Sequence, residues 1–263
     1  MGISAQVIAG RVTNAAAVVT SVTPNSGDSL QVASFATTSA AYLENLWASQ
    51  ATAGVVRVKS PQMHDQAQGL RLQSGDTQPR LLMPDGARQP LYTGEILDLA
   101  MTGGAAEVDV AAMLLTYDDR PGIAANLAAW SEVQGRVQQL AGVEVDGTTS
   151  ATAGDWNAGR AINADFNNLK AGVNYAVLGY TVSAKCAVVA LQGPATGNVR
   201  LGGPGSIEAE NTRSYFVDVA EASGKPFIPI INGSDAGATL LYLCDPATAA
   251  AVHVSLLVAQ LSS

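Results

Sequence analysis

Groups that carry out catalysis, bind metals or form cross-links are scarce in this chain. Its 263 residues include two cysteines, Cys186 and Cys244, and two histidines, His64 and His253. Two cysteines exclude a disulfide framework, and a structural zinc site would need ligands that the chain hardly has. Both cysteines stand in apolar runs, which predicts small core residues. His253 alternates with Val252 and Val254, so we expect it to face the other side of a strand rather than bind a metal.

Charged residues are also in short supply. Asp, Glu, Lys and Arg make up 14% of the chain, against about 25% in an ordinary soluble domain. The 14 basic residues are outnumbered by 22 acidic ones, for a net charge of −8. The counterion release that drives phosphate binding therefore has little to act on, and no sequence-specific nucleic acid is expected as a partner. Apolar residues reach 48%, which predicts an unusually neutral surface, as expected where copies of the same chain cover it.

Long apolar runs and targeting signals are missing as well. No run approaches the roughly 20 apolar residues that a membrane-spanning helix needs. Even residues 249–257 are interrupted by His253 and Ser255. The first residues lack the basic and apolar regions of a secretory signal, and the first basic residue is Arg11. We therefore expect a chain that does not span a membrane and that is made in a host cytoplasm.

Enzyme motifs are absent, so no catalytic, cofactor-binding or metal-binding residue is expected, and no enzyme. The chain lacks a Gly-x-Ser-x-Gly elbow, a phosphate-binding Gly-x-x-x-x-Gly-Lys loop and a His-Glu-x-x-His pair. Residues 193–197 and 201–205 are rich in glycine but contain proline, which removes N–H donors, so they are predicted to be turns. The sharpest acidic cluster, residues 117–122, contains Asp118 and Asp119 without the spacing of a calcium loop. It predicts a turn that leads into a helix.

What is present is a β pattern. Short apolar stretches separated by Gly, Pro, Asn and Asp recur about every ten residues. The expected strands are residues 15–22, 30–35, 54–59, 69–72, 80–83, 95–100 and 107–117 in the first half, and 176–181, 186–191, 198–201, 215–219, 226–231, 239–244 and 251–261 in the second.

One segment between the halves has a different period, because its apolar residues recur at spacings of three and four. They are Leu127, Trp130, Val133, Val137 and Leu140. This pattern predicts an amphipathic helix over residues 124–140, which would lay one apolar stripe against the β units and hold them rigidly. We therefore expect one unit over residues 1–122, a linking helix over 123–142 and a second unit over 143–263.

The two halves resemble each other in sequence. Residues 97–114 align without a gap on residues 241–258 with six identities in eighteen positions. Weaker matches join residues 89–91 to 225–227, 69–72 to 198–201 and 45–46 to 168–169. The match predicts equivalent core positions in two similar sandwiches for three pairs, Leu97 and Leu241, Val108 and Val252, and Val110 and Val254. Chance recurrence of Ala, Val and Leu is the alternative.

Two similar units with seven or eight short strands each fit a pair of sandwiches or barrels. On this repeat, strand count and composition, the chain resembles the double jelly-roll major capsid proteins of icosahedral bacterial viruses, such as the tectivirus and corticovirus types. The resemblance implies two jelly rolls in tandem, a homotrimer as the building block and self-assembly into a viral shell. It implies a place in the virion beside other virion proteins, and it leaves an internal membrane possible.

Two other functions stay open. One is a phage head decoration or spike protein that binds host polysaccharide, and the other is a sugar-active enzyme with an unrecognised site. Sugar binding calls for an exposed aromatic platform, and Trp156, which follows a turn, has a better claim to exposure than Trp47 or Trp130. We expect all three to be packed. A coat protein should instead bury more than roughly 2,000 Å² per copy against its neighbours.

Overall fold

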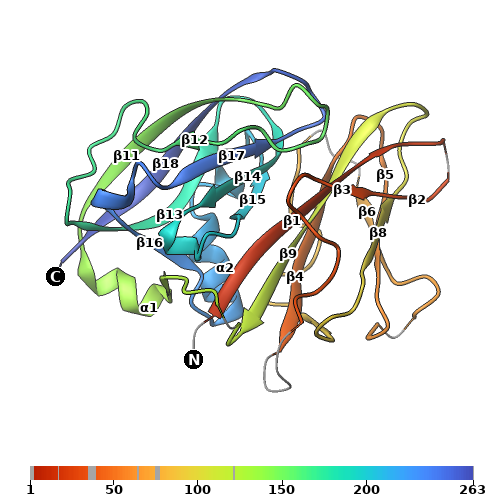
Figure 1. Cartoon of the computed structure of the whole chain (residues 1–263), viewed down its shortest axis with the longest axis horizontal. Helices are drawn as coiled ribbons and strands as arrows, with labels where there is room; N and C mark the ends of the chain where they lie inside the picture. Colours follow the sequence, from red (N-terminus) through yellow and green to blue (C-terminus); the bar gives the residue numbers. More distant parts are fainter. Residues whose placement is uncertain are drawn as a thin grey trace.

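The polypeptide folds into four antiparallel sheets that pack as two sandwiches side by side (Figure 1). The computed structural model describes residues 3–16, 18–34, 40–63, 65–74, 78–120 and 122–262. Two sheets use only strands from residues 3–118, and the other two use only strands from residues 127–261. His64 and Pro121, named above, lie outside the described residues, as do Ala17 and Phe35 of the first two expected strands.

The first sandwich pairs a five-stranded sheet, β3-β1-β9-β4-β7, with a four-stranded sheet, β2-β8-β5-β6. In chain order these strands are β1 (Ile3–Thr13), β2 (Thr20–Ser21), β3 (Thr23–Pro24), β4 (Ala41–Ser49), β5 (Gly54–Lys59), β6 (Leu70–Ser74), β7 (Gln89–Leu91), β8 (Asp98–Met101) and β9 (Val108–Asp118).

The second sandwich pairs the sheet β10-β16-β13-β18-β11 with the sheet β12-β17-β14-β15. Its strands are β10 (Leu127–Ala128), β11 (Val137–Thr148), β12 (Arg160–Ala161), β13 (Asn174–Val182), β14 (Cys186–Gln192), β15 (Leu201–Gly205), β16 (Ile228–Asn232), β17 (Leu240–Cys244) and β18 (Ala251–Leu261). The helices are α1 (Trp130–Val133) and α2 (Tyr215–Ser223), with single 3-10 turns at Gln134–Arg136, Pro194–Thr196, Ala209–Asn211 and Gly233–Asp235.

The two sandwiches share one strand order. The series β1-β9-β4-β7 corresponds to β11-β18-β13-β16, and β2-β8-β5-β6 corresponds to β12-β17-β14-β15. In each unit the first strand pairs with the last, and successive strands alternate between the two sheets except at the hairpins β5-β6 and β14-β15, as in an eight-stranded jelly roll. Strands β3 and β10 are additions at sheet edges. The expected fold class, all-β with two similar jelly rolls in tandem, is confirmed, and we call the units the first and second roll.

The prediction of a helix over residues 124–140 is wrong for most of that segment. A short helix does occur in the connection, but α1 is a single turn, and residues from Val137 onward form β11, which pairs with β18 along its whole length. An isolated helix of this size is marginal in water, and Gly135 and Gly142 weaken it further. Completing the sheet of the second roll satisfies the same backbone groups and buries Val143 and Val145.

Other differences from the expected strands follow from tertiary packing. Residues 215–219, rich in β-forming side chains, belong to α2, which ends at Gly224 in a left-handed conformation with φ of 63°. Its residues Tyr215 and Phe216 are buried with Tyr180 in an aromatic cluster. Strands β1, β4 and β11 were not expected, and the described parts of residues 30–35 and 80–83 form no strand.

The sequence repeat identifies corresponding strands, but its alignment is shifted by one residue at the last strand of each roll. Ala106 and Ala249 both have left-handed φ values, of 61° and 49°, and each lies two residues before the last strand of its roll. The structural offset there is therefore 143 (249 − 106), not the 144 of the sequence match. Since a shift of one residue reverses the face of a strand, Val254 points into the second roll, whereas Val110 points out of the first roll and contacts Gly154.

The expected core equivalence of Val110 with Val254, and of Val108 with Val252, is therefore wrong. Leu97 and Leu241 do correspond, because each is buried inside its own roll at the strand before the last. The match of residues 45–46 to 168–169 also fails, since Asn45 lies in β4 and Asn168 lies before β13.

The contact between the rolls joins unlike sheets. The outer face of β1, β9 and β4 packs on β14 and β15 of the second roll, so β9 is buried on both faces along most of its length. Trp47 of β4 is fully buried there and donates its indole N–H to the carbonyl of Ala187 at 2.8 Å. Trp130, by contrast, is only partly buried, at the edge of the second core.

We expect Trp47→Ala to destabilise the protein by about 3 to 5 kcal/mol, because it leaves a cavity between the rolls and an unpaired carbonyl. Trp130→Ala should cost clearly less, since α1 is one turn at an edge. Urea unfolding of both variants, followed by tryptophan fluorescence and circular dichroism, measures the difference. Equal losses would mean that the α1 connection, and not the sheet contact, holds the rolls together.

Candidate functional site

The contact between the two rolls, here called the inter-roll interface, holds polar side chains that link distant parts of the chain, among them Asn25, Asp28 and Asp155. Its apolar part is one cluster, in which outward residues of the first roll join the core of the second. The first roll contributes Ala5, Val7, Ala9, Trp47, Val110, Ala112 and Leu114. Backbone also crosses the interface, because the N–H of Val7 donates to the carbonyl of Arg200 at 2.8 Å.

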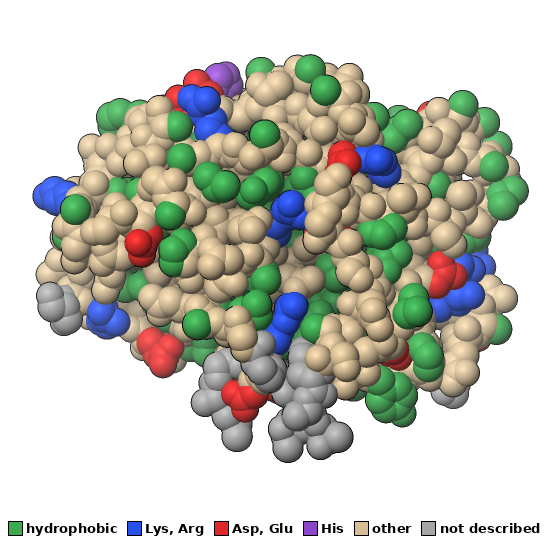
Figure 2. Space-filling model, in the orientation of Figure 1, with side chains coloured by type: hydrophobic (Ala, Val, Ile, Leu, Met, Phe, Trp, Pro, Cys, Tyr) green, Lys and Arg blue, Asp and Glu red, His purple; other side chains and the backbone are tan. Residues whose placement is uncertain are grey.

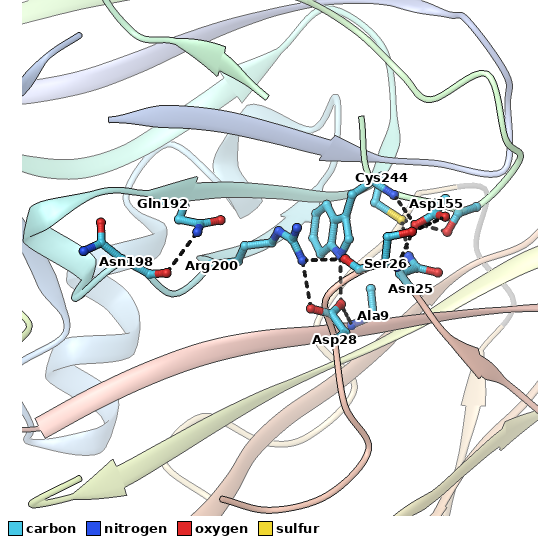
Figure 3. Close-up of polar contacts among 11 residues, drawn as sticks. Ala9, Asn25, Ser26, Asp28, Asp155, Gln192, Asn198, Arg200 and Cys244 are labelled. Atoms are coloured by element: carbon cyan, nitrogen blue, oxygen red, sulfur yellow. Dashed lines mark hydrogen bonds and ion pairs between the residues drawn. The ribbon is translucent and has the colours of Figure 1, made fainter. Parts of the chain in front are cut away.

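A first polar group in this interface is centred on Asp155 (Figure 3). Its carboxylate accepts hydrogen bonds from the N–H and the Oγ of Ser26, both at 2.9 Å, and pairs with Arg11 at 2.7 Å. Desolvation opposes ionisation, but the hydrogen bonds from Ser26, Arg11 and the Trp156 N–H together outweigh it and lower the pKa of Asp155 to about 2. Asp155 therefore joins the rolls as a carboxylate.

A second polar group surrounds Asp28 (Figure 3). The Asp28 carboxylate accepts from the Ala9 N–H at 2.9 Å and the Trp156 indole N–H at 2.8 Å, and it pairs with Arg200 at 3.0 Å. The Arg200 guanidinium lies 4.8 Å from the ring centres of both Trp156 and Tyr242. Burial raises the pKa of Asp28 despite these partners. Both oxygens of the Asp28 carboxylate accept a hydrogen bond from the second roll.

Both cysteines are buried and free, as expected. Cys244 accepts a hydrogen bond from the Asn25 amide at 3.2 Å, across the interface, and donates to the Gly154 carbonyl at 3.2 Å. Burial raises the pKa of the Cys244 thiol well above its usual value and also raises that of Cys186. Since the thiolate is the reactive form, neither cysteine is placed as a nucleophile.

Asp109 is a buried carboxyl in the first roll, at the start of β9. It is 1% exposed and accepts a hydrogen bond from the Asn14 amide at 2.5 Å. Desolvation and the nearby charge of Glu107 raise its pKa to about 6, and Lys185 of the second roll reduces the effect only partly. Asp109 thus titrates close to neutral pH.

A cavity of about 460 Å³ opens beside the Asp28 group, between β1 and the loop before β15. The lining includes Gln6, Asp28, Tyr117, Arg120, Asn198 and Arg200. Its volume would admit a small molecule. However, its charged side chains already have partners: Asp28 pairs with Arg200, and Arg120 donates to Gln6 at 2.5 Å. The cavity contains polar groups but no nucleophile beside a base among its described residues.

Two other features that the sequence analysis named are the acidic cluster at Asp118 and Asp119 and the histidine His253. Asp118 ends β9 and Asp119 follows with φ of 55°, so this cluster is a strand end and not the entry to a helix. As expected, His253 lies on the exposed face of β18, whereas Val252 and Val254 lie on its buried face. The Nδ1 atom of His253 is 2.5 Å from Oδ1 of Asp146.

Two of the three tryptophans are buried. Trp47 is 0% and Trp156 is 6% exposed, and Trp130 is half-buried, so the expectation that they pack is confirmed for Trp47 and Trp156. In the part of the chain that the structure describes, the exposed aromatic rings are Tyr92 of the first roll and Phe166 of the second. Among the described residues, no group of three or more His, Cys, Asp or Glu side chains is placed to hold a metal ion. In the same residues, no helix is long and apolar enough to cross a membrane.

Comparison with known proteins adds little. No protein-family model and no curated protein sequence matches the chain. Among solved structures, the PBSX exported protein XepA is similar with a TM-score of 0.27 and 10% identity, covering 96% of this chain and 86% of that one. The STIV MCP is similar with a TM-score of 0.21 and 10% identity, covering 99% and 97%. Such scores are too low to establish a shared fold, so strand order carries the jelly-roll assignment.

Asp155→Asn should destabilise the protein at pH 7, because it removes the charge of an interface carboxylate whose pKa is lowered. The stability that this charge supplies is complete above the unfolded pKa near 4 and is lost as the pH falls through about 2. We therefore expect the gap between wild type and variant to shrink between about pH 4 and pH 2 in urea unfolding. Asp65→Asn is the control, since Asp65 is exposed and accepts from the N–H groups of Ala67 and Gln68 in its own loop. A gap that does not change with pH would contradict this role.

Asp109→Asn should have the opposite pH dependence. A carboxyl with a pKa of about 6 in the folded state and about 4 when unfolded binds more protons when folded, so wild-type stability falls as the pH rises between these values. From pH 4 to pH 7 we expect stability to shift in favour of the variant by up to about 3 kcal/mol. Parallel pH profiles of the two proteins would show that Asp109 ionises normally.

Proposed function

We propose that this protein is a coat protein of a virus, which assembles as a homotrimer into an icosahedral shell and has no enzymatic activity. The observation that carries the proposal is the pair of jelly rolls with one strand order, fixed to each other by an extensive interface. Two like units held in one geometry are suited to repeated contacts with identical neighbours.

The side chains at the inter-roll interface support a structural role. Asp28 and Asp155 are hydrogen-bonded between the rolls, and Cys244 is a buried, protonated thiol. Their partners are groups of the chain itself, which fits a role in holding the rolls together rather than in substrate chemistry.

The surface supports association with copies of the chain. Figure 2 shows the charged side chains of one face as small, separate groups among polar and apolar atoms. Contact over such a face would take few charged groups out of water. Within the proposal, the location is the virion, and the partners are further copies and other virion proteins.

The alternative, a head decoration or spike protein that binds host polysaccharide, has less support. Trp47 and Trp156 are buried, and the exposed Tyr92 and Phe166 belong to different rolls. They do not form one aromatic platform for stacking sugars.

The test is the size and form of the purified protein. We expect light scattering to find trimers or larger assemblies well above the 26.9 kDa of one chain, and negative-stain images to show six-lobed particles or shells. A monomer at every concentration and salt tested would overturn the coat proposal. Binding to a polysaccharide array by that monomer would favour the alternative.

A further inference from the structure

The inter-roll interface joins two different kinds of face. The five-stranded sheet of the first roll presents its outer side to the four-stranded sheet of the second. Because the rolls share one topology, this leaves one face of each kind uncovered. These are the outer side of the four-stranded sheet of the first roll and, in the five-stranded sheet of the second, the outer side of β11 and β18, since α2 and the residues before it pack on β13 and β16. Figure 1 places β5, β6 and β8 at one end of the long axis and β11 and β18 at the other.

The uncovered face of the first roll is basic. Arg57 and Arg71 are paired opposite each other on β5 and β6, and Lys59 is opposite Asp98 of β8 on the same side. Asp98 pairs with both Arg57, at 2.8 Å, and Lys59, at 3.2 Å, and Arg71 is exposed. Three cations against one carboxylate give this basic face a net charge of about +2.

The uncovered face of the second roll is acidic. Glu144 and Asp146 point outward from β11, and their cross-strand neighbours on β18 are Ser255 and His253. The side chains of Asp146 and His253 are 60% and 66% exposed. Pairing with Asp146 raises the pKa of His253. The two carboxylates give this acidic face about −2 when His253 is neutral and about −1 when it is protonated.

We propose that the acidic face of one copy docks on the basic face of a second copy, repeating between chains the sheet-on-sheet contact that joins the rolls within a chain. This inference rests on the proposed self-assembly and names the surfaces that mediate it. The two faces lie at opposite ends of one molecule, so they meet only between copies. A contact between unlike faces passes from copy to copy and closes into a ring when the rotation allows it.

The chemistry of the two contacts differs in a way that fits their roles. The interface within the chain buries Trp47, Val7 and Leu114, as suits rolls that are covalently joined and never separate. The free faces carry the charged groups, with Leu140 as an exposed apolar residue on the side of Glu144 and Asp146. Charge complementarity then sets the register and excludes pairing of two like faces.

Charge reversal on each face tests the docking. One variant combines Lys59→Glu with Arg71→Glu, a second combines Glu144→Lys with Asp146→Lys, and a third carries all four changes. The matched control is Arg80→Glu with Asp85→Lys, two exposed residues between β6 and β7 that lie beside Pro204 and Tyr215 of the second roll. Sedimentation velocity over a concentration series, at low and high salt, gives the concentration for half-assembly. Circular dichroism melting confirms the fold of each protein.

Each single-face variant should raise the half-assembly concentration at least about tenfold. The variant with all four substitutions should return this concentration to near the wild-type value, and the control should leave it unchanged. High salt should weaken wild-type assembly. If Lys59→Glu with Arg71→Glu lowers the melting temperature, Arg71→Glu alone serves for that face, because the Arg71 side chain makes only a long hydrogen bond, to Gln68 at 3.4 Å, among the described residues.

The docking proposal would be wrong if the single-face variants assembled like wild type, or if the variant with all four substitutions stayed dispersed. Either result would leave the coat proposal standing. A wild-type protein that never assembles would instead overturn the coat proposal. The two failures are therefore distinguishable.

Discussion

The fold depends on burying both faces of one sheet. Strands β1, β9 and β4 line the core of the first roll on one side and the second roll on the other. A sheet covered on both sides cannot alternate polar and apolar residues, and β9 accordingly carries nearly unbroken apolar side chains. Trp47 fills the outer side of this sheet, while Leu43 and Leu46 lie in the core of the first roll. Exposing the sheet by separating the rolls would place this apolar surface in water.

Polar side chains then fix how the rolls sit on each other. Hydrophobic contact between two sheets is not directional, but the ion pairs of Arg11 with Asp155 and of Arg200 with Asp28 have defined geometry. The opposite pKa shifts of the two carboxyls reflect their surroundings: Asp155 gains more from its donors than it loses by desolvation, and Asp28 does not. Removing one partner of such a pair leaves a desolvated charge, which costs more than the pair contributes.

The same geometry relates the chain to its proposed assembly. Because like rolls meet through unlike faces, the molecule ends in one acidic and one basic face that correspond in kind to the two already joined. In the proposed assembly, sheet-on-sheet contacts therefore alternate along the row of rolls. One contact joins the two covalently linked rolls of a chain, and the next joins rolls of neighbouring copies.

The sequence by itself determined the fold class, the duplication and the absence of recognisable enzyme motifs. Turn residues at regular spacing predict strands whatever their partners, and β5 and β18 were predicted with their observed bounds. Local patterns failed where distant partners decide: β11 begins in a segment with helical spacing but pairs with β18, and Tyr215 enters a helix because it completes an aromatic cluster. Only the tertiary structure revealed Arg200 beside Asp28, since 172 residues separate them in sequence. Such pairs form through long-range packing and leave no local periodicity to detect.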